Sequence, residues 1–166
     1  MTTLTPHFTL EEFCASQTAS RLGIDNSLPA TLQENAIKTC LGLERVRLLL
    51  NANAIRISSG YRSESLEKVI CNDAYSQWCL KHSKPKTTES WLEYFATKAH
   101  SKALAADFTS TFGSPKVIVQ LISGSSIKFD QLIWEYGETG WTHISFSDNP
   151  RRQVLTVDKL GTRAFT

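Results

Sequence analysis

The chain has 166 residues, a length typical of one domain, and 41% hydrophobic with 20% charged residues, as in folded globular proteins. Its formal net charge is only +2 and it has no long run of Lys or Arg, so we expect no nucleic-acid partner. Apolar runs such as "LLL" at Leu48–Leu50 are far too short to cross a membrane, so no membrane insertion is expected. The first residues lack the basic and apolar pattern of a secretory signal, which predicts synthesis in a cytoplasm and another exit route for any action elsewhere.

The clearest predicted helix lies at residues 31–51. Thr31 and Glu34 have the spacing of a capping box, and apolar residues then recur every three or four positions. The other expected elements are, in chain order, a short helix capped by Thr9, a short strand at 55–57, helical segments at 64–82 and 88–100, a strand at 103–110, a helix from Ser114 to 123, two strands within 129–146 and a last strand at 152–157.

Helices dominate the first part of this order and strands gather later, which predicts an α+β fold with a small antiparallel sheet packed against helices. We find no repeat and no flexible linker, so residues 1–166 are expected to form a single domain. The four cysteines form no CxxC pair, and buried reduced thiols are therefore expected at Cys14, Cys40, Cys71 and Cys79.

Two of the four histidines are candidates for a metal site. A catalytic zinc needs about three ligands from His, Asp or Glu and an open position for water. His7 lies near the chain end and His82 lies in a polar loop, so neither is expected to bind a metal. His100 and His143 lie beside or within predicted strands and stay in consideration.

His100 and Asp107 are separated by six residues. On one helix they would lie about 10 Å apart along the axis, too far for ligands that each approach zinc to about 2 Å. The pair can share a metal only if residues 102–104 form a turn that leads Asp107 into the next strand. By itself, this spacing is a weak signal.

His143 strengthens the hypothesis, because strand alternation places it on the polar face of "GWTHISF". A hydrolytic zinc site also needs a general base. Glu135 would lie about 5 Å from His143 if the hairpin paired the two residues, a register that needs the turn centred on Thr139. Glu138, within the turn, is the alternative base.

The segment "SSGYRS" contains Arg62 directly after a strand and a glycine turn. An arginine held there can bind a carboxylate with two hydrogen bonds, so Arg62 is a candidate for substrate binding. Ser59 and Tyr61 of the same segment are further substrate-binding candidates. A surface salt bridge is the alternative role for Arg62.

In order along the chain, "SGYRS", "HSKALAADF", "FDQLIWE" and "WTHISF" resemble the zinc D-alanyl-D-alanine carboxypeptidases, most closely the phage-type branch of peptidoglycan endopeptidases. The opening "HFTLEEFCASQTASRLGIDNSLP" is also similar to that branch. The resemblance implies a Hedgehog/DD-peptidase-like fold and Zn²⁺ held by His100, Asp107 and His143. It also implies an acidic base near the last ligand and a substrate-binding role for Arg62.

The sequence departs from the family pattern at three places. Lys98 and Ala103 stand where Ser and Gly are usual, and the change to Ala is harmless only if that position has an ordinary φ. Residues 70–97 are longer than the usual segment, which predicts a helical insertion at the rim of the cleft. The turn between Glu135 and His143 is also longer than usual.

The leading hypothesis is a monomeric zinc peptidase that acts on bacterial peptidoglycan after release from the cell or as part of a virion. Two alternatives remain at this point. One is a catalytically silent wall-binding or virion structural module of the same fold, and the other is a zinc dipeptidase. The sequence does not separate carboxypeptidase from endopeptidase activity.

Overall fold

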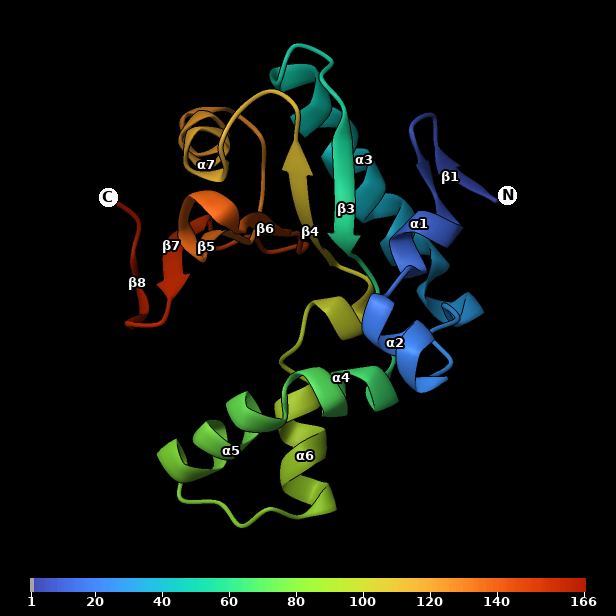
Figure 1. Ribbon diagram of the computed structural model, residues 1–166, viewed down its shortest axis with the longest axis vertical. Helices are drawn as coiled ribbons and strands as arrows, with labels where there is room; N and C mark the ends of the chain where they lie inside the picture. The colour runs from blue at the N-terminus through green and yellow to red at the C-terminus, as the bar shows by residue number, and fades with distance from the viewer. Residues whose placement is uncertain (1) are drawn as a thin grey trace.

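A computed structural model describes residues 2–166, which contain a six-stranded sheet with the order β3-β4-β6-β5-β7-β8 (Figure 1). A two-stranded sheet of β1 and β2 lies near the N-terminus. The strands are β1 (Thr3–Thr5), β2 (Phe8–Thr9), β3 (Ile55–Ser59), β4 (Ala105–Ser110), β5 (Gln131–Glu135), β6 (Trp141–Ser145), β7 (Gln153–Asp158) and β8 (Gly161–Ala164).

The α+β class expected from the sequence is confirmed, but the large sheet is mixed and not wholly antiparallel. Strand β7 pairs in parallel with β5, with Gln131 opposite Gln153, whereas the other neighbouring strands are antiparallel. After β6 the chain crosses to the far side of β5 before it forms β7. The hairpin of β5 and β6 therefore keeps β6 inside the sheet, next to β4.

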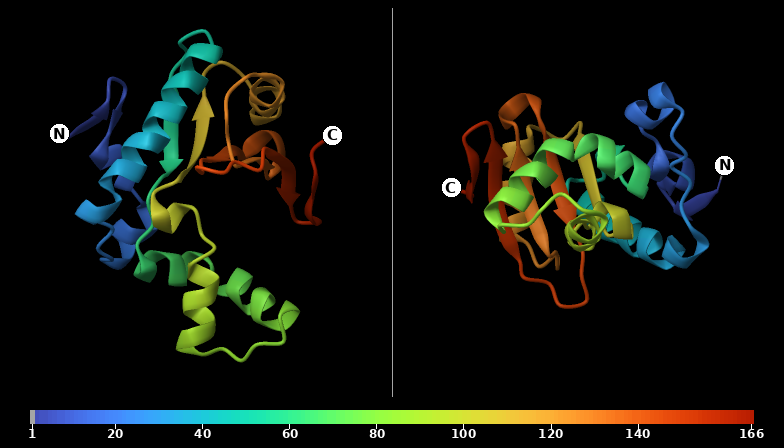
Figure 2. Two further views of the ribbon diagram at one scale, coloured as in Figure 1. Left: turned by 180° about the vertical axis from the view of Figure 1, so that it is seen from behind. Right: turned by 90° about the horizontal axis from the view of Figure 1, so that it is seen from below.

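Helices α3 (Gln33–Leu49) and α7 (Pro115–Gly124) cover one face of the sheet (Figure 2). Phe108 of β4 and Ile144 of β6 are fully buried in the core on that face. Because side chains alternate along a strand, their neighbours Asp107 and His143 point to the opposite face. The core therefore fixes which face of the sheet carries the polar residues.

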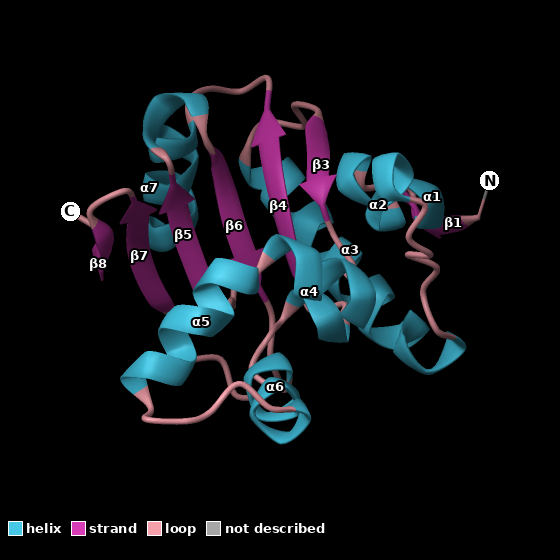
Figure 3. Ribbon diagram, turned by 60° about the horizontal axis from the view of Figure 1, so that its bottom comes forward, coloured by secondary structure: helices cyan, strands magenta, loops and turns pink. Residues whose placement is uncertain are grey.

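On the other side of the sheet lie α4 (Glu64–Ile70), α5 (Asn72–Lys81) and α6 (Thr88–Phe95) (Figure 3). These helices include most of the segment predicted as an insertion at residues 70–97. They have a small aromatic core of their own, separate from the main cluster, made of Tyr75, Cys79, Trp91 and Tyr94 with Trp78 and Phe95 packed against it. The single-domain organisation and the insertion stay predictions.

The starts of the helices agree only partly with the predicted caps. Thr9 caps α1 (Leu10–Cys14) by accepting a hydrogen bond from the N–H of Glu12, as expected. Thr31 does not cap α3, because a 3-10 turn, η1 (Ala30–Leu32), precedes this helix and takes up Thr31. The remaining helix is α2 (Gln17–Leu22), and no helix within residues 2–166 has the length and apolar character needed to cross a membrane.

Candidate metal centre

Three candidate ligands meet on the sheet face opposite α3 and α7. His100 begins the 3-10 turn η2 (His100–Lys102), and the chain then turns at Ala103 into β4, which carries Asp107. Asp107 is directly opposite His143 of β6. The structure thus contains the turn into a strand that a shared metal requires.

The potential ligand atoms of these three residues all lie within 4.8 Å of one another. Nε2 of His100 is 3.3 Å from Nδ1 of His143 and 3.3 Å from Oδ1 of Asp107. Nδ1 of His143 is 2.8 Å from the same oxygen. Two ligands that each lie about 2.0–2.1 Å from a tetrahedral zinc are about 3.3–3.4 Å apart, so the donor types fit zinc and two of the three separations have this spacing.

The surroundings orient the first histidine for this role. Nδ1 of His100 lies 2.7 Å from the carbonyl oxygen of Gly60 and donates to it, because a carbonyl can only accept. Its Nε2 is therefore the atom that faces Asp107 and His143. Such a second contact typically fixes the tautomer and the ring plane of a metal-binding histidine.

The ionisation of the cluster also suits a metal. Burial by itself would raise the pKa of Asp107, but the charges and hydrogen bonds of His100 and His143 outweigh burial and hold this pKa well below its ordinary value. Burial lowers the pKa of His100, against the opposing effect of Asp107. An anionic carboxylate and a neutral imidazole are the forms that bind zinc.

Glu135 ends β5, but it does not lie opposite His143 as predicted. The hairpin pairs Glu135 with Trp141 and places Ile133 opposite His143, so the predicted register is wrong by two residues. The turn is centred on Glu138 because Tyr136 and Gly137 adopt a left-handed conformation and lead into η3 (Gly137–Thr139).

Glu135 nevertheless lies on the same sheet face as His143, because the shift is an even number of residues. Burial, and then the charge of Asp107, raise the pKa of the Glu135 carboxyl above its ordinary value. Glu138 lies in η3 and is exposed to solvent. Of the two candidate bases, Glu135 is the one beside the cluster.

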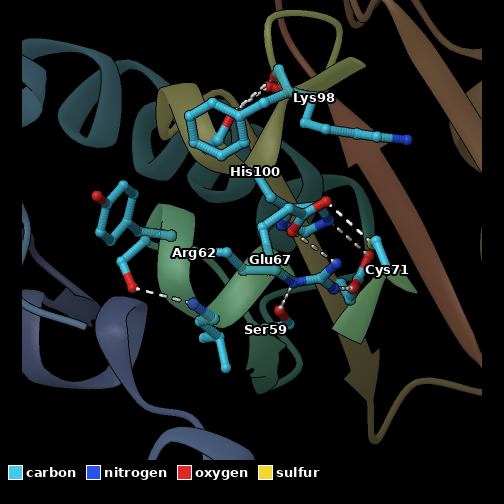
Figure 4. Close-up of polar contacts among 12 residues, drawn as sticks. Ser59, Arg62, Glu67, Cys71, Lys98 and His100 are labelled. Atoms are coloured by element: carbon cyan, nitrogen blue, oxygen red, sulfur yellow. Dashed lines mark hydrogen bonds and ion pairs between the residues drawn. The ribbon is translucent and has the colours of Figure 1, made fainter. Parts of the chain in front are cut away.

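Arg62 contacts the cluster directly. Its Nη2 donates to Oδ2 of Asp107 over 2.7 Å, and its Nε donates to Oγ of Ser59 over 2.8 Å (Figure 4). Arg62 therefore holds the Asp107 oxygen that does not face the histidines. Tyr61 is only 7% exposed and packs in the main hydrophobic core, and its role in substrate binding stays a prediction.

The first half of the chain matches a known family. Residues 6–81 match the family model described as Peptidase M15. This match supports the family expected from the sequence, that of the zinc D-alanyl-D-alanine carboxypeptidases. No curated protein matches the chain.

M15 peptidases depend on zinc, and the cluster of His100, Asp107 and His143 supplies a set of donors that could bind it. The matched range contains Arg62 but ends at Lys81, before all three candidate ligands. The family match and the geometry of the cluster therefore come from different parts of the chain. Both indicate the same cofactor.

A cleft of about 600 Å³ adjoins the candidate metal centre, and Ser59, Arg62, Asp107 and Trp141 are among the residues that line it. Sequence reasoning missed one further cation in it, Arg56. Arg56 lies opposite Thr109 on the face that carries Asp107, and its side chain is exposed. The sequence did contain a signal for Arg56. It lies between Ile55 and Ile57 in a predicted strand, and side-chain alternation places it on the face away from the core.

Two positions where the chain departs from the M15 pattern differ in their consequences. Ala103 has a φ of 57°, a left-handed conformation in which glycine is favoured. The replacement of the usual Gly by Ala therefore strains the backbone at this position. Lys98 is half-buried and its ammonium group lies 3.9 Å from the centroid of the Tyr94 ring. His7 and His82 lie elsewhere: His7 is hydrogen-bonded to Glu44, and the ring of His82 packs at a tilt against Trp78.

Proposed function

We propose that this protein is a zinc-dependent peptidase that hydrolyses an amide bond in the peptide of bacterial peptidoglycan, with the metal held by His100, Asp107 and His143. The observation that carries the proposal is the spacing of the three ligand atoms, 2.8–3.3 Å apart. The two separations that involve His100, each 3.3 Å, are those of ligands around one tetrahedral zinc, and the 2.8 Å hydrogen bond between His143 and Asp107 would lengthen by about 0.5 Å when the metal binds. The family match supports the same activity independently.

Zinc, when bound, supplies a reactive water at neutral pH and polarises the carbonyl group of the substrate. Glu135 is the proposed general base, which accepts the proton of the attacking water and donates it to the leaving amine. Its raised pKa favours this exchange, because a base whose pKa lies nearer to neutrality returns its proton more readily. Arg62 keeps Asp107 turned toward the metal position.

The lining of the cleft supports a substrate that carries carboxylates. Arg56 and Arg62 are its basic residues and Asp107 is its acidic one, and the hydroxyl groups of Ser16, Thr18, Ser58, Ser59 and Thr109 also line it. Arg62 is already engaged by Asp107 and Ser59, so we assign the binding of a substrate carboxylate to Arg56. Peptidoglycan stem peptides carry such carboxylates. From the resemblance to the phage-type branch, we also propose a role as an endolysin or a virion-associated enzyme.

The proposal is tested by incubating purified peptidoglycan with the protein and identifying the released fragments by mass spectrometry. Fragments that appear with the zinc-loaded protein and disappear with a chelator are the expected result, and their masses identify the bond as D,D or L,D and the cut as terminal or internal. Equal release with and without chelator would contradict a zinc mechanism. Absence of release from a zinc-loaded protein would favour a wall-binding or structural module.

A further inference from the structure

Glu67 is a fully buried carboxylate on α4 that the proposed mechanism does not use. It is 1% exposed. Its Oε1 accepts a hydrogen bond from the thiol of Cys71 over 3.0 Å, whereas its Oε2 has no hydrogen-bond partner within residues 2–166. A buried carboxylate is costly unless a cation compensates it, so the position calls for an explanation.

The nearest cation is Arg62, whose Nη1 lies 3.7 Å from Oε2 of Glu67 (Figure 4). The same guanidinium donates through Nη2 to Oδ2 of Asp107. One cation thus lies between two buried carboxylates, one of which is a proposed metal ligand. The Arg62 side chain is itself only 15% exposed, so solvent screens these interactions weakly.

The Cys71 thiol contacts the Glu67 carboxylate at Oε1, the oxygen that does not face Arg62. Burial and the neighbouring Glu67 raise the pKa of this thiol to about 11, so it stays protonated and can donate to Glu67. Cys71 follows α4 directly and lies one helical turn after Glu67. The thiol therefore helps to fix the Glu67 carboxylate at a position that faces Arg62.

We infer that Glu67 is a positioning residue for the metal centre, acting through Arg62 on Asp107. Glu67 partly neutralises the positive charge of Arg62, so Arg62 withdraws less electron density from Asp107. The Asp107 carboxylate is then a stronger ligand for a divalent cation. The additional negative charge near the site also favours a dication directly. This inference rests on the proposed zinc site, and it adds an outer carboxylate that neither the spacing of the motifs nor the family resemblance indicated.

The test compares zinc affinity, measured by competition with a chromophoric chelator, in the wild type, Glu67→Gln and Glu67→Met. Residues that contact a metal ligand directly typically contribute 10- to 100-fold to affinity. Glu67 acts one residue farther out, through Arg62, so we expect a loss of about 10-fold, the lower end of that range, in both variants. The melting temperature of metal-free Glu67→Met should stay close to that of the wild type, because Arg62 keeps Asp107 as its partner and Oε2 of Glu67 makes no hydrogen bond that the substitution would remove. Glu93→Gln, which removes an exposed carboxylate paired with Lys84, is the matched control and should keep its affinity.

The outcomes separate the inference from the proposed function. Wild-type affinity in both Glu67 variants would overturn the inference while leaving the zinc site intact. A loss of affinity that is accompanied by an equal loss of metal-free stability in Glu67→Met would also overturn it, because Glu67 would then be merely structural. Failure of the wild type itself to bind zinc would instead contradict the proposed function.

Discussion

Arg62 donates a 2.7 Å hydrogen bond from Nη2 to Oδ2 of Asp107, the carboxylate whose other oxygen faces His100 and His143. The arginine that the sequence marks as a substrate-binding residue thus also supports a proposed metal ligand. This contact gives Arg62 a part in folding as well as in chemistry. It also leaves Arg56 as the basic residue of the cleft that can meet a substrate carboxylate.

The first prediction concerns stability without metal. Arg62→Ala should lower the free energy of unfolding by about 3–5 kcal/mol, since it leaves the carboxylates of Asp107 and Glu67 without their shared cation. In a Glu67→Gln background the same substitution should cost clearly less, because only one carboxylate is then uncompensated. Urea unfolding of the four proteins measures this coupling, and strictly additive costs would show that Glu67 and Arg62 do not interact.

The second prediction separates the two candidate bases. Glu135→Gln should reduce peptidase activity by about 10²- to 10⁴-fold, the usual contribution of a general base, while zinc stays bound. Glu138→Gln is the matched control, since Glu138 is exposed in the adjoining turn, and should keep nearly full activity. Turnover and bound zinc would be measured for both proteins. The opposite pattern would move the role of base to Glu138.

The third prediction concerns pH. A general base acts only when it is deprotonated, so kcat/KM should increase with pH as Glu135 loses its proton. Because burial and Asp107 raise the pKa of Glu135, the increase should be centred above its ordinary value of 4.5. Zinc occupancy measured across the same pH range separates this effect from loss of metal. A rise that follows occupancy alone would contradict the assignment of Glu135.

The fourth prediction concerns the carbonyl group that orients His100. A Cβ atom added at Gly60 would lie 2.3 Å from the carbonyl oxygen of Phe13, so Gly60→Ala must displace the segment that accepts the His100 hydrogen bond. Overpacking of this kind typically costs about 1–3 kcal/mol, and we expect weaker zinc binding as well. Calorimetry and zinc titration measure the two effects.

Gly124→Ala provides the comparison, because nothing lies within 4 Å of a Cβ added at that helical position. It should change stability by no more than about 1 kcal/mol and leave zinc affinity unchanged. Equal behaviour of Gly60→Ala and Gly124→Ala would show that close packing at Gly60 does not support His100.

Chemical type and local alternation were enough to predict much of the site. His100, Asp107 and His143 could be named because ligand-type side chains stood next to short strands, and because a turn between the first two was the only geometry compatible with one metal. The α+β class followed from the order of the elements. These inferences depend on the periodicity of apolar residues and on the distance that a few residues of chain can span, and both can be read directly from a sequence.

The register of the hairpin could not be predicted in this way. It depends on left-handed conformations at Tyr136 and Gly137, and the strand pattern is equally compatible with a turn centred one residue later. The parallel pairing of β7 with β5 depends on a crossover whose direction leaves no local signal.

The burial of Glu67 could not be predicted from the sequence either. A glutamate in a predicted helix is ordinarily solvated, and its burial here depends on Arg62, which in turn faces a residue 45 positions farther along the chain. Tyr61 shows the reverse case, since a residue next to a candidate substrate-binding arginine lies in the core. In both cases, the burial of the side chain depends on contacts between residues that are far apart in the sequence.

The most direct test of the zinc site is the amount of zinc retained by the purified protein after dialysis against metal-free buffer. Close to one zinc per chain is expected for the wild type and for His82→Ala, and much less for His100→Ala, Asp107→Ala and His143→Ala, each with the fold confirmed by circular dichroism. Retention of one zinc by any folded variant of the three ligands, or its loss from His82→Ala, would contradict the assignment of the metal centre.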